Sequence, residues 1–141
     1  MTAPYLAVHS IVMATTSRLA TRALATTDPD KWEIQFRKGC LELAILAALS
    51  SGKLYGLEIL RRLEASSNLI VSEGTIYPLL SRLKSEGVLD SEWVESEAGH
   101  PRKYYRLTPV GRRRAAAMAR MWSEFSSNLA NLVSPLLRET R

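Results

Sequence analysis

The strongest constraint in this sequence is an apolar seam near its carboxyl end. Six side chains recur there at intervals of 3, 4, 3, 4 and 3 residues: Ala115, Met118, Trp122, Phe125, Leu129 and Leu132. This is the 3.5-residue period of the a and d positions of a coiled coil, which requires a partner helix. Thr108-Pro109 starts the helix and Pro135 is expected to end it. The seam predicts a dimerisation helix over residues 109–134 and a tail over residues 135–141.

Three shorter helices are predicted before the seam. The first begins at Asp28-Pro29, where a capping residue precedes proline, and ends at Ser50-Ser51-Gly52. Its expected apolar face consists of Trp32, Phe36, Leu41, Ile45, Leu46 and Leu49. The second, which ends at 66–68, carries Leu57, Ile59, Leu60 and Leu63. The third is capped by Ser72, stops at Gly87 and buries Ile76, Leu79, Leu80 and Leu83. Pro78 is expected to distort its first turn without breaking it.

Two extended runs follow, over residues 92–95 and 103–107, with a tip over residues 96–101 that contains Gly and Pro. They predict a β-hairpin, with Trp93 in the core and one of Tyr104 and Tyr105 buried. The fold class is therefore mainly α-helical with a small β-hairpin. This order of elements is that of a winged helix-turn-helix, here over residues 28–108, with an appended dimerisation helix.

Charge is segregated along the hairpin. Residues 86–97 hold five acidic side chains and no basic one, whereas residues 100–114 hold no acidic side chain and six basic ones: Arg102, Lys103, Arg106, Arg112, Arg113 and Arg114. The net charge of the chain is +5. Basic side chains that neutralise phosphates supply most of the non-specific affinity for DNA. A basic run alone is equally consistent with a solvated face, but its place beside a three-helix unit favours double-stranded DNA as the partner.

Four motifs resemble those of the PadR family of bacterial transcriptional regulators. They occupy residues 35–42, 55–59, 73–83 and 99–108, and the resemblance extends from about Trp32 to Leu132. It implies a homodimeric winged-helix DNA-binding protein, usually a repressor, whose affinity for DNA falls when a small molecule or other signal acts. The single carboxy-terminal helix is similar to that of the shorter PadR subfamily.

The candidate DNA-binding residues belong to the third helix, the hairpin and the segment before the second helix. They are Tyr55, Ser72, Thr75, Tyr77, Arg82, Lys84, Arg102 and Lys103. Thr75 and Tyr77 are expected to meet base edges in the major groove, and Tyr55 and Arg82 to hold phosphates. Arg102 and Lys103 are expected to reach flanking phosphates or the minor groove. For Tyr55 and Tyr77 a half-buried core position is the alternative.

The seam also contains a candidate effector site. In the shorter subfamily a tryptophan near this point of the last helix can face its symmetry mate, with flat aromatic drugs stacked between the rings. The residues that would form such a slot here are Met118, Met121, Trp122 and Phe125. The alternative is a packed coiled-coil core without a ligand.

Composition argues against several other classes of protein. One cysteine and two histidines supply neither an internal disulfide nor a zinc site, and the chain has no glycine-rich phosphate loop. No enzyme activity, metal or cofactor is expected, and the predicted location is the reducing cytoplasm. No segment is expected to span a membrane. The remaining alternative is a winged-helix module that binds another protein.

The first 27 residues differ from the rest, because 14 of them are Ala, Ser or Thr and none is acidic. They are interpreted as an amino-terminal arm, expected to be poorly ordered. Two further interpretations stay open: an organellar transit peptide, and a start of translation at Met13.

Overall fold

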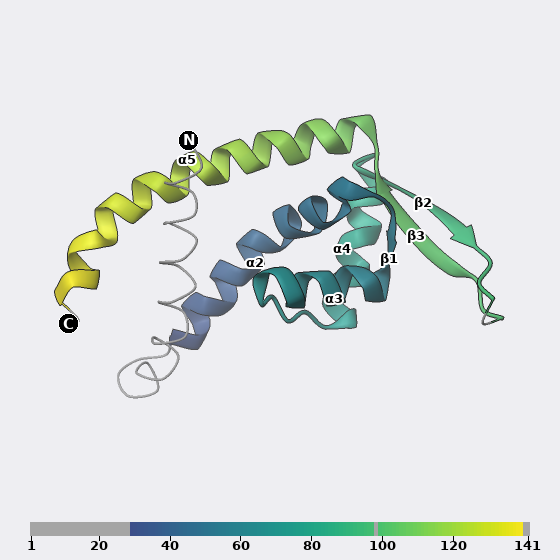
Figure 1. Cartoon of the computed structure of the whole chain (residues 1–141), viewed down its shortest axis with the longest axis horizontal. Coiled ribbons are helices and arrows are strands. Elements are labelled where there is room, and N and C mark those ends of the chain that lie inside the picture. Colours follow the sequence, from purple (N-terminus) through teal and green to yellow (C-terminus); the bar gives the residue numbers. More distant parts are fainter. Residues whose placement is uncertain (1–28, 98, 140–141) are drawn as a thin grey trace. The chain divides into compact units, whose positions relative to one another are not determined.

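The computed structural model describes residues 29–97 and 99–139. The predicted arm and Asp28, the expected capping residue of the first helix, lie outside the described residues. By its internal contacts the described chain divides into a unit of Gln35–Ala117 and a second unit that contains residues 29–34 and 118–139. The elements in chain order are α2 (Pro29–Ala48), a 3-10 turn (Leu49–Ser51), β1 (Leu54–Tyr55), α3 (Gly56–Ser67), α4 (Glu73–Ser85), β2 (Leu89–Val94), β3 (Arg102–Leu107) and α5 (Pro109–Glu139) (Figure 1).

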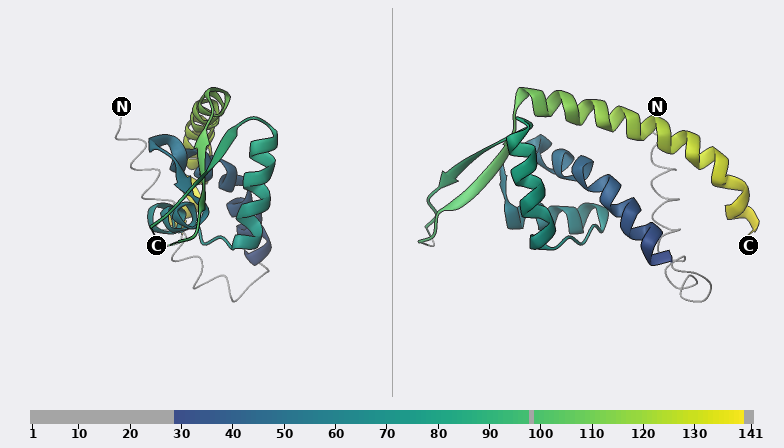
Figure 2. Two further views of the ribbon diagram at one scale, coloured as in Figure 1. Left: turned by 90° about the vertical axis from the view of Figure 1, so that its right-hand side faces the viewer. Right: turned by 180° about the vertical axis from the view of Figure 1, so that it is seen from behind.

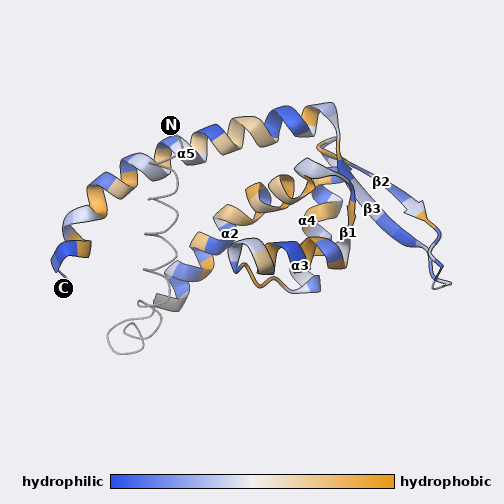
Figure 3. Ribbon diagram, viewed as in Figure 1, coloured by the Kyte–Doolittle hydropathy of each residue, from blue (hydrophilic) through white to orange (hydrophobic). Residues whose placement is uncertain are grey.

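The core of the unit of residues 35–117 is apolar and comes from the second half of α2, from α3 and α4, and from the sheet. Its fully buried side chains are Ile45, Leu46, Leu49, Ile59, Ile76, Leu80, Leu83 and Val88. Most of them lie on the helical faces that the sequence predicts, because residues three and four apart share one face of a helix. Polar and apolar residues alternate along α3 in Figure 3, as this requires. Trp32 and Phe36, expected on the buried face of the first helix, are instead exposed.

The predicted hairpin is part of a three-stranded antiparallel sheet in the order β1-β3-β2. The short strand β1 pairs Leu54 with Tyr105, and β2 pairs Leu89 with Leu107 at its inner end and Val94 with Arg102 at its outer end. The hairpin of β2 and β3 extends beyond α3 and α4 (Figure 2). We call this projecting hairpin the wing.

The expectation that Trp93 anchors the wing in the core is wrong, because 67% of its surface is exposed. Trp93 pairs with Lys103, two residues along β3 from the buried Tyr105. Side chains two apart on a strand share a face, so Trp93 is on the face that packs on the helices. It lies beyond the point where that packing stops. Of the two adjacent tyrosines Tyr105 is buried and Tyr104 is half-buried, as predicted.

The last helix does not end at Pro135. Instead α5 continues to Glu139, with Pro135 inside it. Proline has no N–H to donate to the carbonyl four residues back, which is that of Asn131. The hydroxyl of Ser134 donates to this carbonyl at 3.1 Å and replaces the missing donor. A local side-chain donor therefore satisfies the carbonyl that the proline leaves without a backbone partner.

Candidate nucleic-acid interface

The amino-terminal half of α4 presents polar side chains to solvent. Ser72 is the capping residue, as predicted, and its carbonyl accepts from the backbone N–H groups of Thr75 and Ile76 at 3.1 Å each. Its hydroxyl, however, does not cap the backbone but forms a 3.0 Å hydrogen bond with the hydroxyl of Thr75. Both side chains are exposed. The first turn of α4 thus carries a coupled pair of hydroxyls able to donate and accept hydrogen bonds.

Tyr77 lies at the boundary between core and surface. A Cβ atom added at Gly56 would come within 2.5–2.7 Å of the Tyr77 ring and hydroxyl, so the ring rests directly on the first residue of α3. It nevertheless keeps 38% of its surface exposed. The ring therefore packs between α3 and α4 with one side exposed, and a contact of Tyr77 with DNA stays a prediction.

The wing and β1 together form a cluster of cationic and aromatic side chains, which we call the wing cluster: Lys53, Tyr55, Arg102 and Tyr104. The Arg102 guanidinium lies 4.6 Å from the centre of the Tyr55 ring. The rings of Tyr55 and Tyr104 meet edge to face, with centroids 5.6 Å apart and planes at 74°. Lys53 Nζ lies 5.4 Å from the centre of the Tyr104 ring. Each cation is therefore held over an aromatic ring, where the electrostatic attraction favours it.

The wing cluster brings together Tyr55 and Arg102, which the sequence identifies separately. Lys53 and Tyr104 were not identified as candidate binding residues. They share a face with the other two because β1 pairs with β3, which matches Tyr55 with Tyr104. A two-residue strand carries too little periodicity to reveal this pairing.

Lys103 lies on the opposite face of the wing from Arg102, since the two are adjacent on β3. Its ammonium is 5.8 Å from the centres of the Trp93 and Tyr105 rings. Within the described part of the chain neither Arg102 nor Lys103 forms an ion pair. The two faces of the wing thus each carry a cation without a carboxylate partner.

Other basic side chains near the wing are neutralised within the protein. Lys53 pairs with Glu92 at 2.8 Å, and this hydrogen bond holds the pKa of Glu92 below its ordinary value. Arg106 pairs with Asp90 at 3.0 Å and lowers the pKa of that carboxyl in the same way. Both carboxylates are therefore ionised at neutral pH, and the positive charge of the wing is concentrated toward its outer end.

The remaining predicted DNA contacts of α4 lie near its carboxyl end. Lys84 is exposed, whereas Arg82 forms ion pairs with Glu86 at 2.8 Å and with Glu42 at 3.2 Å. A contact of Arg82 with a phosphate stays a prediction, and it would compete with two carboxylates. The structure thus separates the candidates of α4 into an exposed group at its start and a partly paired group at its end.

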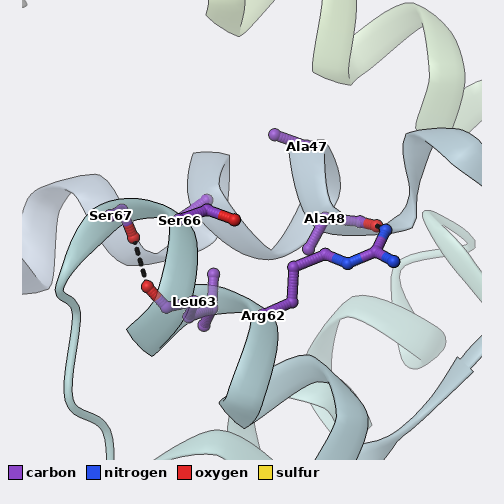
Figure 4. A pocket seen from close by; sticks show the side chains of 7 residues that line it. Ala47, Ala48, Arg62, Leu63, Ser66 and Ser67 are labelled. Atoms are coloured by element: carbon purple, nitrogen blue, oxygen red, sulfur yellow. Dashed lines mark hydrogen bonds between the residues drawn. The ribbon is translucent and has the colours of Figure 1, made fainter.

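A shallow hollow between α2 and α3 is lined mainly by small side chains (Figure 4). Arg62 lies at its edge and donates to the carbonyl of Ala48 at 3.3 Å and to the hydroxyl of Ser51 at 2.9 Å. The Ser67 hydroxyl donates to the carbonyl of Leu63 at 2.6 Å. These polar groups already have partners inside the protein, so the hollow offers little chemistry for a ligand.

The second half of α5 keeps its apolar seam at the surface of the chain. Phe125 is 64% exposed and Leu132 is 75% exposed, and Leu129 is exposed as well. The earlier seam residues Ala115, Met118 and Trp122 are half-buried, and Met121 is exposed. Such a row of large apolar side chains on one helix is typical of an interaction surface.

The described residues hold no group of three or more His, Cys, Asp or Glu side chains that would bind a metal ion. Cys40 is half-buried, and burial raises the pKa of its thiol. None of the helices described is both long and apolar enough to cross a bilayer.

Comparison with known proteins agrees with this geometry. The model of the transcriptional regulator PadR-like family matches residues 45–117, which include every candidate DNA-binding residue. Transcriptional regulator Rv3488 of Mycobacterium tuberculosis is 35% identical over 78 residues, 55% of this chain and 71% of that protein. The crystal structure of a PadR-like regulator from Bacillus cereus has a TM-score of 0.65 at 35% identity and covers 70% of this chain and 96% of its own. A PadR-like transcription factor from Bacteroides fragilis has a TM-score of 0.60 at 40% identity, with 72% and 98% covered.

Proposed function

This chain belongs to the transcriptional regulator PadR-like family, and on that premise we propose that it is a homodimeric repressor that binds a nearly palindromic operator. It is a transcriptional regulator with a winged-helix DNA-binding fold, and not an enzyme. In the proposed mechanism, occupancy of the operator blocks transcription. A small molecule or another signal then lowers the affinity for DNA.

The observation that carries this proposal is the pairing of an exposed, hydroxyl-rich start of α4 with a cationic wing in one unit. We assign Ser72, Thr75 and Tyr77 to base edges in the major groove, where an inserted helix meets donors and acceptors that distinguish base pairs. We assign Arg102 and Lys103 to flanking phosphates or the minor groove. The Tyr55 ring holds the Arg102 guanidinium in position and so reduces the entropy lost on binding.

The homodimer is proposed to form through the seam of α5. Two such helices paired along Ala115, Met118, Trp122, Phe125, Leu129 and Leu132 would remove these apolar side chains from water. Twofold symmetry then presents two copies of α4 to two half-sites, about 34 Å apart along the duplex. An inverted repeat in the operator follows from this symmetry.

The salt dependence of binding to duplex DNA tests the assignment of the wing. If both cations neutralise phosphates, the double variant Arg102→Ala, Lys103→Ala lowers the slope of log K against log salt concentration by about two. A matched control, Arg120→Ala with Arg138→Ala, removes the same charge from the exposed surface of α5 and should leave the slope unchanged. Equal slopes in wild type and wing variant would remove the wing from the interface. A wild type without any salt dependence would indicate a protein-binding module.

We further propose that the effector is a flat aromatic molecule that enters between the two chains beside Trp122. Met118, Met121 and Phe125 surround this position in the seam and offer polarisable and aromatic surface. Titration with planar aromatic cations and phenolic acids should quench tryptophan fluorescence in the wild type, and the response should be lost in Trp122→Phe. Unchanged fluorescence across the panel would leave a packed seam without a ligand slot.

A further inference from the structure

The carboxyl end of α4 and the first turns of α5 are held together by contacts of three kinds, which we call the α4–α5 joint. The first kind is hydrogen bonding by Thr108, the residue before α5. Its hydroxyl accepts from the N–H of Gly111 at 3.0 Å and donates to the carbonyl of Gly87 at 2.6 Å. Its backbone N–H donates to the carbonyl of Val88 at 3.1 Å. One residue thus caps α5 and fixes it to the turn that ends α4.

The second kind is direct backbone packing. Gly87, with φ of 75°, closes α4 in a tight turn in which the N–H of Val88 donates to the carbonyl of Leu83 at 3.0 Å. A Cβ atom added at Gly111 would collide with the carbonyl of Val88. The glycine therefore permits α5 to begin in contact with this turn.

The third kind is an ion-pair network that spans three helices. Arg114 of α5 pairs with Glu86 at 2.8 Å and approaches Glu42 of α2 at 3.7 Å. Arg82 of α4 pairs with the same two carboxylates at 2.8 and 3.2 Å. These side chains are partly exposed, so single pairs contribute little to stability. Together they link the start of α5 to α4 and α2 through two arginines and two shared carboxylates.

We propose that Glu86 and Arg114 are positioning residues that set which separation of operator half-sites the dimer accepts. The seam of α5 begins at Ala115, one residue after Arg114, so the joint lies between the proposed dimer contact and the recognition helix α4. If the joint is rigid, the paired α5 helices fix the separation of the two α4 helices. If it is loosened, each α4 can adapt to a wider range of half-site separations. This inference rests on the homodimer and operator proposed above.

The test uses duplexes in which two inverted half-sites, selected from a random pool, are separated by one base pair more or less than the best binder. One base pair turns a half-site by about 34° and shifts it by about 3.4 Å. Wild type should prefer the best spacing on the order of tenfold, because the alternative must strain DNA or protein.

In Arg114→Gln the preference should fall to about threefold or less. Arg113→Gln removes the same charge from an adjacent exposed arginine, for which the described structure gives no ion pair, and should keep the wild-type preference. Arg114→Lys should restore most of it.

Hydrogen exchange measured without DNA tests the role of Arg114 in the joint separately from the proposed binding to an operator. Backbone amides of residues 86–88 and 110–114 should exchange several-fold faster in Arg114→Gln than in wild type and Arg113→Gln. An unchanged spacing preference in Arg114→Gln would contradict the proposed role of Arg114 and leave the proposed homodimer and operator unaffected. A wild type that binds no inverted repeat would contradict both the proposed function and the proposed role of Arg114. Unchanged hydrogen exchange in Arg114→Gln would contradict the role of Arg114 without any reference to DNA binding.

Discussion

At the scale of single residues, the close contact between Gly56 and Tyr77 can be tested by substitution. In Gly56→Ala the new methyl group would meet the Tyr77 ring at less than van der Waals distance, so the ring must move. Overpacking of this kind costs about 1–3 kcal/mol, and we expect thermal or chemical denaturation to show a loss in this range. Gly39→Ala is the control, because no atom lies within 4 Å of its added Cβ and the position is helical. It should stabilise the protein by roughly 0.5–1 kcal/mol. Equal effects of the two substitutions would contradict the packing of Tyr77 on Gly56.

The ring of Tyr55 supports a second prediction at this scale. Tyr55→Phe keeps the aromatic face under Arg102, whereas Tyr55→Leu keeps apolar volume and removes the quadrupole that attracts the cation. We therefore expect Tyr55→Leu to weaken duplex binding by about two- to fivefold, as loss of an exposed cation–π contact implies. Tyr55→Phe should remain within about twofold of wild type unless the hydroxyl itself contacts a phosphate. Fluorescence anisotropy with a labelled duplex measures both, and a Tyr55→Leu variant with wild-type affinity would show that Arg102 needs no aromatic support.

At the scale of secondary-structure elements, α5 continues through Pro135 although proline removes one backbone donor from the helix. Pro135→Ala restores the backbone donor to Asn131, and alanine is the better helix former by about 3 kcal/mol. Amides of residues 131–139 should then exchange at least about tenfold more slowly. Ser134→Ala removes the substitute donor but leaves the exposed carbonyl to water, so exchange should change by less than about threefold. An unchanged exchange rate in Pro135→Ala would mean that the proline does not limit this end of the helix.

The helices could be predicted from the sequence because their apolar spacing and caps are local. Pro29, Thr108-Pro109 and Gly87 each mark a helix boundary that the structure confirms. Two of the failures, the missed strand β1 and the exposed Trp93, share a physical cause, which is that they depend on residues distant in the chain. Strand β1 forms only because it meets β3 about fifty residues later. The exposure of Trp93 depends on where the helices stop beneath the sheet, and alternation along a strand fixes only the face.

The same distinction applies to the candidate site. Tyr55, Tyr77 and Arg102 could each be identified from residue type and predicted element. Their supports could not, since Gly56 beneath Tyr77 and the ring of Tyr55 beneath Arg102 are tertiary contacts. Likewise the ion pair of Arg82 with Glu42, forty residues away in the chain, follows from the approach of α2 to α4. The sequence thus supplies candidate DNA-binding groups, and tertiary packing determines which of these side chains are supported by a neighbouring residue or engaged in ion pairs.

At the scale of the whole molecule, operator binding is expected to depend on the proposed pairing of two chains. Leu129→Glu adds a charge to the seam, where pairing would bury it at a cost that exceeds the lost apolar contact. The variant should be monomeric at micromolar concentration in sedimentation experiments, with the circular dichroism of the folded protein. Asn131→Glu adds the same charge two residues away at an exposed position outside the seam, and it should remain dimeric.

DNA-binding measurements should then distinguish recognition of one half-site by a single chain from recognition of two half-sites by a pair of chains. A monomer retains α4 and the wing, so its affinity for a duplex with one half-site should equal that of wild type. On a duplex with two inverted half-sites the wild type gains the effective concentration of its second unit, which is worth roughly a hundredfold or more. Leu129→Glu should lose this gain while Asn131→Glu keeps it. If Leu129→Glu bound the full operator as tightly as wild type, recognition would not require pairing through α5, and the twofold symmetry of the operator would need another source.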